Sequence, residues 1–220
     1  MTTWVDTLGT FARRVYSQTG EEGVLEAIFQ NVGTTSRYLV DIGAGDGTAL
    51  SNTRLFLESG WHGARFDANY AGDVHQERIT AENVCDILAK YNVPGEVDLL
   101  SLDIDGFDWY VLRAILRTYT PRVFVCEVNN ALPAEPPLAI KYDPAFVFGN
   151  NAYFGATVSA FKLLGETFGY TLAHVHHFNA FFVRNELMPE GAVPVINYVQ
   201  YSGWPADPRP WVPVTVEECR

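Results

Sequence analysis

The chain has 220 residues, of which 48% are hydrophobic and 14% aromatic, and this content excludes a disordered chain. The formal net charge of -11, with only 15 lysine and arginine residues, disfavours nucleic acid and anionic membranes as partners. No segment approaches the roughly 18 apolar residues of a membrane span, and residues 1–14 lack the apolar core of a signal peptide. We therefore expect one cytoplasmic domain over residues 1–220 that acts on a small molecule.

The N-terminal part, residues 1–35, is predicted to form a helical cap. An amphipathic helix is expected over Trp4–Arg14 and a second over Val24–Gln30. Acidic residues precede the second helix, as helix N-termini prefer. Gln18 and Glu21 lie between the two helices, and they either cap the second helix or form a flap over a ligand.

The stretch Tyr38–Gly47 joins a buried-strand pattern to a turn with three glycines at alternate positions. This pattern is typical of a turn whose backbone approaches a nucleotide ligand closely. It matches neither the dinucleotide fingerprint G-x-G-x-x-G nor a phosphate-binding loop. The carboxylates of Asp41 and Asp46 would repel a phosphate, whereas they suit a ligand that carries an amino group.

The elements that follow alternate between helix and strand. A helix is predicted over Thr48–Ser59, a strand over Gly63–Asp67 and a short strand over Arg78–Thr80. Asp67 ends its strand where α/β sheets place an acidic side chain against ribose hydroxyls, although an ordinary loop carboxylate would look the same. Asn83 begins the next helix, where it either caps the helix or faces the adenine of a nucleotide ligand.

Two further strands end in oxygen ligands. The strand over Val97–Asp103 leads into three carboxylates, those of Asp103, Asp105 and Asp108. Capping of the next helix could explain Asp108 or Asp105, but it does not need all three. The strand that begins at Val123 ends at Glu127, followed by two asparagines. Because ligands of open α/β sheets bind at the carboxyl ends of the strands, we expect the strand-end carboxylates to face one crevice.

The last third begins with residues 131–152, a proline-rich loop that we expect to line a substrate pocket. A helix from Thr157 closed by Gly169 follows, and then two strands over Tyr170–His174 and Asn179–Arg184. These bring the number of predicted strands to seven. Residues 189–220 are predicted to form an extended tail at a subunit contact, which makes a homo-oligomer an expected partner.

These landmarks resemble the FkbM-like small-molecule methyltransferases of the class I S-adenosylmethionine-dependent family. The resemblance spans most of residues 16–184. Its motifs are VDIGAGDG at Val40–Gly47, SNT at Ser51–Thr53, GW at Gly60–Trp61, LLSLDIDG at Leu99–Gly106 and VCEVN at Val125–Asn129. Where the family usually has KIDVEG, this chain has SLDIDG, so Ser101 and Asp105 replace the expected residues.

The resemblance implies an α/β, Rossmann-like class I methyltransferase fold, with a mostly parallel seven-stranded sheet and helices on both faces. It also implies S-adenosylmethionine as the cofactor. The predicted cofactor-binding residues are Gln18, Asp41, Gly43, Gly45, Asp46, Asp67, Asn83 and Asp103.

Methyl transfer to a hydroxyl group requires that this acceptor lose its proton, and two routes to the deprotonation are open. Hard oxygen ligands from adjacent strand ends suit Mg²⁺, and the predicted metal ligands are Asp103, Asp105, Glu127 and Asn129. The alternative is that these groups only bind the cationic end of the cofactor and cap helices. The other route is a side-chain base, with Asp105, His176, His177 and His174 as candidates. Tyr153 either orients the substrate or packs against neighbouring side chains of the fold.

The leading hypothesis is O-methylation of a small natural product or sugar. A second hypothesis places the methyl group on nitrogen or carbon. A third keeps the fold as a cofactor-binding scaffold that does not methylate.

Overall fold

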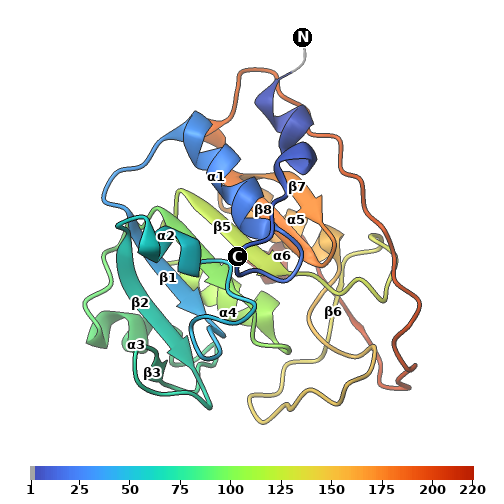
Figure 1. The fold of residues 1–220 in the computed structure, drawn as a ribbon. Helices are drawn as coiled ribbons and strands as arrows, with labels where there is room; N and C mark the ends of the chain where they lie inside the picture. The colour runs from blue at the N-terminus through green and yellow to red at the C-terminus, as the bar shows by residue number, and fades with distance from the viewer. Residues whose placement is uncertain (1–2) are drawn as a thin grey trace.

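A seven-stranded sheet forms the centre of the computed structural model, which describes residues 3–220 (Figure 1). The strands are β1 (Tyr38–Ile42), β2 (His62–Asp67), β3 (His75–Gln76), β4 (Leu99–Leu102), β5 (Val123–Glu127), β7 (Tyr170–His176) and β8 (Asn179–Arg184). Their order across the sheet is β3-β2-β1-β4-β5-β8-β7, and only β8 runs antiparallel to its neighbours. The predicted seven-stranded, mostly parallel sheet is confirmed.

Helices cover both faces of this sheet, as predicted. They are η1 (Trp4–Phe11), α1 (Glu21–Val32), α2 (Arg54–Glu58), α3 (Val84–Lys90), α4 (Asp108–Leu116), α5 (Val158–Thr167), η2 (Asn185–Leu187) and α6 (Val216–Cys219). Because strand side chains alternate between faces, Leu39 packs with η1, α1 and α2, whereas Val40 packs with α3, α4 and α5. Within residues 3–220, none of the helices is long and apolar enough to cross a membrane.

The helix predicted over Thr48–Ser59 is mostly a turn, and α2 starts only at Arg54. Leu50 has a φ of +58°, which a helix does not allow. The Ser51 hydroxyl then accepts hydrogen bonds from the N–H groups of Thr53 and Arg54, and this local bonding replaces the first helical turns.

The short strand predicted over Arg78–Thr80 is wrong, because β3 lies at His75–Gln76. The His75 ring stacks on Tyr91 at a centroid distance of 4.0 Å, and this contact fixes the residue that pairs with β2. Residues 78–80 instead form a turn held by the Asn83 amide, which accepts from Thr80 N–H and donates to the Arg78 carbonyl.

The first predicted helix is a 3-10 helix that ends at Phe11, before Arg14. The chain leaves it at Ala12 so that the Arg13 N–H can donate to the Gly20 carbonyl at 3.2 Å. Residues 1 and 2 of the predicted cap lie outside the described residues.

The tail lies along the proline-rich loop of its own chain. Strand β6 (Leu138–Ala139) of the loop pairs with β9 (Val212–Pro213) of the tail. The Tyr198 hydroxyl contacts the carbonyls of Asn129 and Leu132, and the Tyr201 N–H donates to the Asn130 carbonyl at 2.7 Å. The tail therefore closes an intramolecular surface, and the expected subunit contact stays a prediction.

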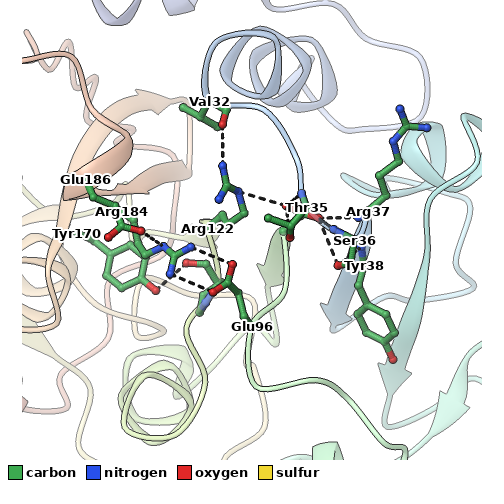
Figure 2. Close-up of polar contacts among 12 residues, drawn as sticks. Val32, Thr35, Ser36, Arg37, Tyr38, Glu96, Arg122, Tyr170, Arg184 and Glu186 are labelled. Atoms are coloured by element: carbon green, nitrogen blue, oxygen red, sulfur yellow. Dashed lines mark hydrogen bonds and ion pairs between the residues drawn. The ribbon is translucent and has the colours of Figure 1, made fainter.

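The amino edge of the sheet holds a fully buried carboxylate, that of Asp98. It accepts hydrogen bonds from the backbone N–H groups of Thr35, Ser36 and Arg37 at 2.6–2.9 Å. Arg122 forms an ion pair with it at 3.3 Å, and Figure 2 shows these donors together beside the start of β1. The group is therefore fully compensated, and it ties the segment before β1 to the core.

Candidate active site

Two glycines shape the turn that follows β1. Gly43 and Gly45 have φ values of +85° and +55°, which side-chain-bearing residues rarely adopt. A Cβ at Gly43 would overlap the carbonyl oxygen of Asp103, just after β4, so only glycine fits. The Asp67 carboxylate at the end of β2 accepts from the Gly45 N–H at 2.9 Å. The ends of β1, β2 and β4 therefore meet at this turn.

Two adjoining cavities lie at this edge. The β2-side cavity has a volume of about 330 Å³ and includes Asp67 in its wall. The β5-side cavity has a volume of about 360 Å³ and includes Glu127. Both volumes are in the range of small-molecule sites. The two cavities share Gly43, Gly45, Asp103 and Asp105, so they form the two halves of one cleft.

The β2-side cavity combines charged side chains, among them the carboxylate of Asp67 at the end of β2, with apolar side chains. Each Asp67 oxygen accepts one backbone N–H, from Gly45 at 2.9 Å and from Asn69 at 2.7 Å, which leaves further acceptor capacity on both oxygens. The apolar part of the wall is formed by Ile42, Phe66, Ile79, Ile104, Phe107 and Phe146. This wall suits a flat ring beside a pair of hydroxyl groups, and the role of Asp67 toward a ribose stays a prediction.

The β5-side cavity contains a carboxylate cluster. Oxygen atoms of Asp103, Asp105 and Glu127 lie within 4.8 Å of one another. Since β4 and β5 are parallel neighbours, their carboxyl ends bring these residues together. Glu127 Oε2 is buried and has no hydrogen-bond partner among residues 3–220. An uncompensated buried carboxylate oxygen is costly, which indicates a site built to receive a cation or a proton.

The electrostatics of the cluster agree with this interpretation. Burial is the main cause that raises the pKa of Asp103 well above its ordinary value, and the charges of Asp108 and Asp105 add to it. Burial likewise raises the pKa of Glu127, with further contributions from Asp103 and Asp108. Partial burial of its carboxyl group, and then the charge of Asp67, raises the pKa of Asp105. Each group therefore favours a neutralising partner.

Asp108 holds the turn that presents the cluster. It is fully buried at the start of α4, and its two oxygens accept from the N–H groups of Ile104 at 2.8 Å and Gly106 at 2.9 Å. Between these two lies Asp105, which has a φ of +54°. Burial raises the pKa of Asp108 to about 6. Capping thus explains Asp108 and leaves Asp103 and Asp105 free to face the cleft.

Asp41 lies deeper in the same half of the cleft. Its carboxylate accepts from the Thr53 hydroxyl at 2.6 Å, and burial raises its pKa to about 6. The neighbouring Asn52 donates to the Ser101 hydroxyl at 3.4 Å, and both line the cavity. The turn over residues 51–53 therefore faces the cleft.

Gln18 lines the β5-side cavity from a loop tied down by two buried carboxylates. Glu22 accepts from three successive N–H groups, those of residues 15–17, at 2.6–3.0 Å. Glu21 accepts from the Thr19 N–H at 2.8 Å and from the Asn179 amide at 3.0 Å. The structure thus places Gln18 in the cavity wall, while Glu21 holds its loop in place; a role of Gln18 as a flap over a ligand stays a prediction.

Two predicted cofactor-binding residues line neither cavity. Asp46 Oδ1 accepts from the N–H groups of Thr48 and Ala49, both at 2.8 Å, on the exposed side of the glycine turn. The Asn83 amide is engaged in the turn before α3. Their roles toward a cofactor stay predictions that this placement does not support.

Asn129 does not join the carboxylate cluster, because its fully buried amide is engaged elsewhere. Its Nδ2 donates to the carbonyls of Ala152 and Phe154, and its Oδ1 accepts from the Ala131 N–H. The next residue, Asn130, lines the β5-side cavity in its place.

The three histidines also lie outside both cavities. His176 Nε2 is 2.9 Å from the carbonyl oxygen of Thr19, and His177 occupies the β7–β8 turn with a φ of +52°. Burial lowers the pKa of His174 to about 4. The residue of this hairpin that lines the cleft is Phe178. The structure therefore does not bring the predicted histidine bases together with the carboxylates.

Tyr153 has the packing role that was its alternative. It is buried, and its hydroxyl accepts from the Lys141 N–H at 3.0 Å and donates to the Pro210 carbonyl at 3.1 Å. The Arg209 guanidinium lies 4.1 Å from its ring centroid. Tyr153 thus joins the loop to the tail instead of facing a substrate.

Among the residues of the β5-side wall that were not predicted are Asn130, Phe178 and Trp204. Asn130 directly follows the VCEVN motif, and that proximity is the only signal for it in the sequence. Trp204 comes from the tail, where an aromatic residue among prolines gives no indication of the surface on which it docks.

The strand order, with its single reversed strand, is that of the Rossmann-like class I methyltransferase fold. No protein-family model and no curated protein matches the chain. Among solved structures, it is similar to the MycE methyltransferase from the mycinamycin biosynthetic pathway, in complex with Mg and SAH. The identity is 16% and the TM-score 0.36, and the match covers 80% of this chain but only 55% of that chain. A likeness of this size carries no weight for either the fold or the function of this chain.

Proposed function

We propose that the chain is an S-adenosylmethionine-dependent methyltransferase that methylates an oxygen atom of a small natural product or sugar. The observation that supports this most is the divided cleft, in which Asp103 and Asp105 lie between a β2-side half, with Asp67 and an apolar wall, and a β5-side half, with Asp41 and Glu127. In this fold, ligands bind at the carboxyl ends of the strands, where both halves lie.

The proposed cofactor fits the residues of the cleft. Its adenosine part would occupy the β2-side cavity, with the ribose hydroxyls on Asp67 and the base among the apolar side chains. Its cationic amino acid part would lie near Asp41 and Asp103, on the side shared by both cavities. Gly43 and Gly45 permit the close approach, since a Cβ at Gly43 would already overlap Asp103. When bound, the cofactor supplies a methyl group on a positively charged sulfur.

A divalent cation fits the carboxylate cluster. Asp103, Asp105 and Glu127 would hold it, because hard carboxylate oxygens are the ligands that Mg²⁺ prefers and Glu127 Oε2 has no other partner among the described residues. When bound, such a cation lowers the pKa of an acceptor hydroxyl.

The chain's own residues would orient the acceptor and receive its proton. Asp105 is the most exposed carboxylate of the cluster and lines both halves of the cleft, so it is the group best placed to accept the proton. Gln18, Phe178 and Trp204 would cover the acceptor and limit the access of water. Positioning of this kind can contribute roughly 7–11 kcal/mol to a transfer reaction.

Calorimetric titration with S-adenosylmethionine and S-adenosylhomocysteine tests the cofactor. We expect saturable binding at one site per chain, and absence of binding would contradict the proposal. Mass spectrometry of acceptors incubated with the protein then separates catalysis from a non-methylating scaffold, because transfer adds one methyl group. Nuclear magnetic resonance of the product would distinguish oxygen from nitrogen or carbon as the methylated atom.

Thermal denaturation in EDTA, with and without excess Mg²⁺, tests the cation. We expect Mg²⁺ to raise the melting temperature of the native chain, because a ligand that binds only the folded state stabilises it. Unchanged melting together with full activity in EDTA would exclude a functional cation.

A further inference from the structure

The tail forms part of the acceptor half of the cleft. Trp204 lines the β5-side cavity together with Phe154 and Phe178. Its ring lies 5.7 Å from the ring of Phe154 and 5.6 Å from that of Phe148, both in edge-to-face geometry. Phe154 is almost fully buried, whereas Trp204 and Phe178 are partly exposed, so these two rings keep surface available at the cavity.

The backbone around Trp204 is fixed on both sides. The Tyr201 N–H donates to the Asn130 carbonyl at 2.7 Å, and the Pro205 carbonyl accepts from the Ala152 N–H at 2.9 Å. Beyond these, Asp207 accepts from the Asn151 amide at 2.9 Å. Since the ring is already held in place, binding a ligand against it costs little additional ordering.

The wall of this half is chemically divided. Its polar part includes carboxylates from the strand ends together with Gln18, Asn52 and Asn130, and its apolar part includes aromatic rings from the hairpin turn, the segment before α5 and the tail. A wholly apolar ligand would leave the carboxylates without a partner. A small acyclic polar ligand would gain nothing from three aromatic rings. The ligand that satisfies both parts carries hydroxyl groups on a ring with a flat apolar face.

We propose that Trp204 is a specificity-determining residue that selects hydroxylated rings as acceptors, by packing against the flat face of the ring. This inference rests on the proposed methyl transfer. The chemistry is shared by phenolic rings and by sugar rings, which also present a flat C–H face. A hydroxyl group of the packed ring then lies toward the carboxylate cluster.

Three variants of the full chain test this proposal. W204A removes the ring and W204F keeps a smaller one. W211F is the matched control, because Trp211 belongs to the same tail and packs on Tyr153 at 5.1 Å but lines neither cavity. Titration with S-adenosylhomocysteine should give the same affinity for all three variants and the native chain, which also shows that each variant is folded.

The acceptor assay measures release of S-adenosylhomocysteine with catechol and 4-nitrocatechol, with methyl and phenyl glycosides, and with glycerol and serine as acyclic hydroxy compounds. We expect turnover with ring compounds, and the preference between the first two groups identifies the phenolic or the sugar class. W204A should raise KM for the best acceptor at least about tenfold with a smaller change in kcat, W204F should lie between, and W211F should match the native chain.

Three results would overturn the proposal: an equal KM in W204A, a preference for acyclic acceptors, or no binding of any ring compound to the S-adenosylhomocysteine complex in saturation-transfer measurements. Each leaves the cofactor proposal intact. Failure of S-adenosylhomocysteine itself to bind would instead remove the proposed function, so the two failures are distinguishable.

Discussion

At the amino edge of the sheet, the buried carboxylate of Asp98 receives three backbone N–H groups and an ion pair from Arg122 (Figure 2). At the carboxyl edge, Glu127 is partly buried beside two other carboxylates, and its buried Oε2 has no donor among the described residues. The first arrangement stabilises the fold, whereas the second lowers its stability and leaves acceptor capacity facing a cleft. The supply of hydrogen-bond donors therefore separates the structural carboxylate of Asp98 from the candidate cation ligand Glu127.

The largest expected effect is the loss of stability on removing Asp98. D98A removes the acceptor of three part-buried backbone N–H groups and leaves Arg122 without its partner, so we expect the free energy of unfolding to fall by about 3–5 kcal/mol. Urea denaturation measures this. The control is E96Q, since Glu96 forms a more exposed ion pair with Arg184 and should cost less than about 1 kcal/mol. Equal losses in the two variants would break the comparison.

Asp67, at the carboxyl edge, should affect binding more than stability. D67A removes a charged acceptor from the β2-side cavity, and we expect the Kd for S-adenosylhomocysteine to rise about 10- to 100-fold. Calorimetric titration provides the measurement. D67N, which keeps one acceptor oxygen, should fall between the native chain and D67A. An unchanged Kd in D67A would place the ribose elsewhere.

Removal of a charge from the cluster should stabilise the metal-free protein. E127Q relieves repulsion from Asp103 and Asp105, and we expect a gain of about 1 kcal/mol, or about 2–4 °C in Tm. The same variant should lose the stabilisation by Mg²⁺ that the native chain shows. E186Q is an exposed control. A lower Tm for E127Q in EDTA would show that Glu127 has a structural partner.

The stabilisation by E127Q should grow with pH. A carboxyl group whose folded-state pKa is raised destabilises the fold as pH rises from its ordinary value, near 4.5, through the folded-state value. The amide introduced by E127Q does not titrate, so the difference in Tm between this variant and the native chain should be smaller at pH 5 than at pH 8. Both proteins share all other titrating groups, including His174, so the difference reports Glu127 together with its interaction with Asp103. A difference that shrinks with pH would have the wrong sign.

The smallest effect is expected for Asp46, a carboxylate at the carboxyl edge that already has backbone donors. By the comparison above it should behave as a structural residue. D46N should change the Kd for S-adenosylhomocysteine by less than about twofold, measured by calorimetry. A large loss of affinity would confirm the sequence-based prediction that Asp46 binds the cofactor. It would also show that a carboxylate at this edge of the sheet can bind a ligand even when backbone N–H groups already donate to it.

The parts of the fold that could be predicted from sequence are those with strong local patterns. Strands β1, β4 and β5 are mainly apolar because both of their faces are covered, and this pattern makes them recognisable in the sequence. Strand β3 could not be located in this way. It is two residues long, and its register depends on a contact between His75 and Tyr91 from a distant helix.

The candidate site was predictable where the strands determine it. The carboxylates of Asp103 and Glu127 follow from strand ends that meet at one edge. The choice between Asn129 and Asn130 did not follow, because beyond the end of a strand the direction of successive side chains depends on the loop they join. The histidines have the residue type of a base, but strand β7 carries His176 toward Thr19, a contact with no local signal.

Residues 131–156 and the tail contact each other through β6 and β9 and through the hydrogen bond from Tyr198 to the Leu132 carbonyl, and they complete the cleft without contributing a strand to the central sheet. The two segments therefore form a natural cassette for protein engineering. Exchanging them together between scaffolds of this architecture would transfer their part of the acceptor half together with Phe146 of the nucleoside half, whereas exchanging one alone would separate the paired halves of the cassette.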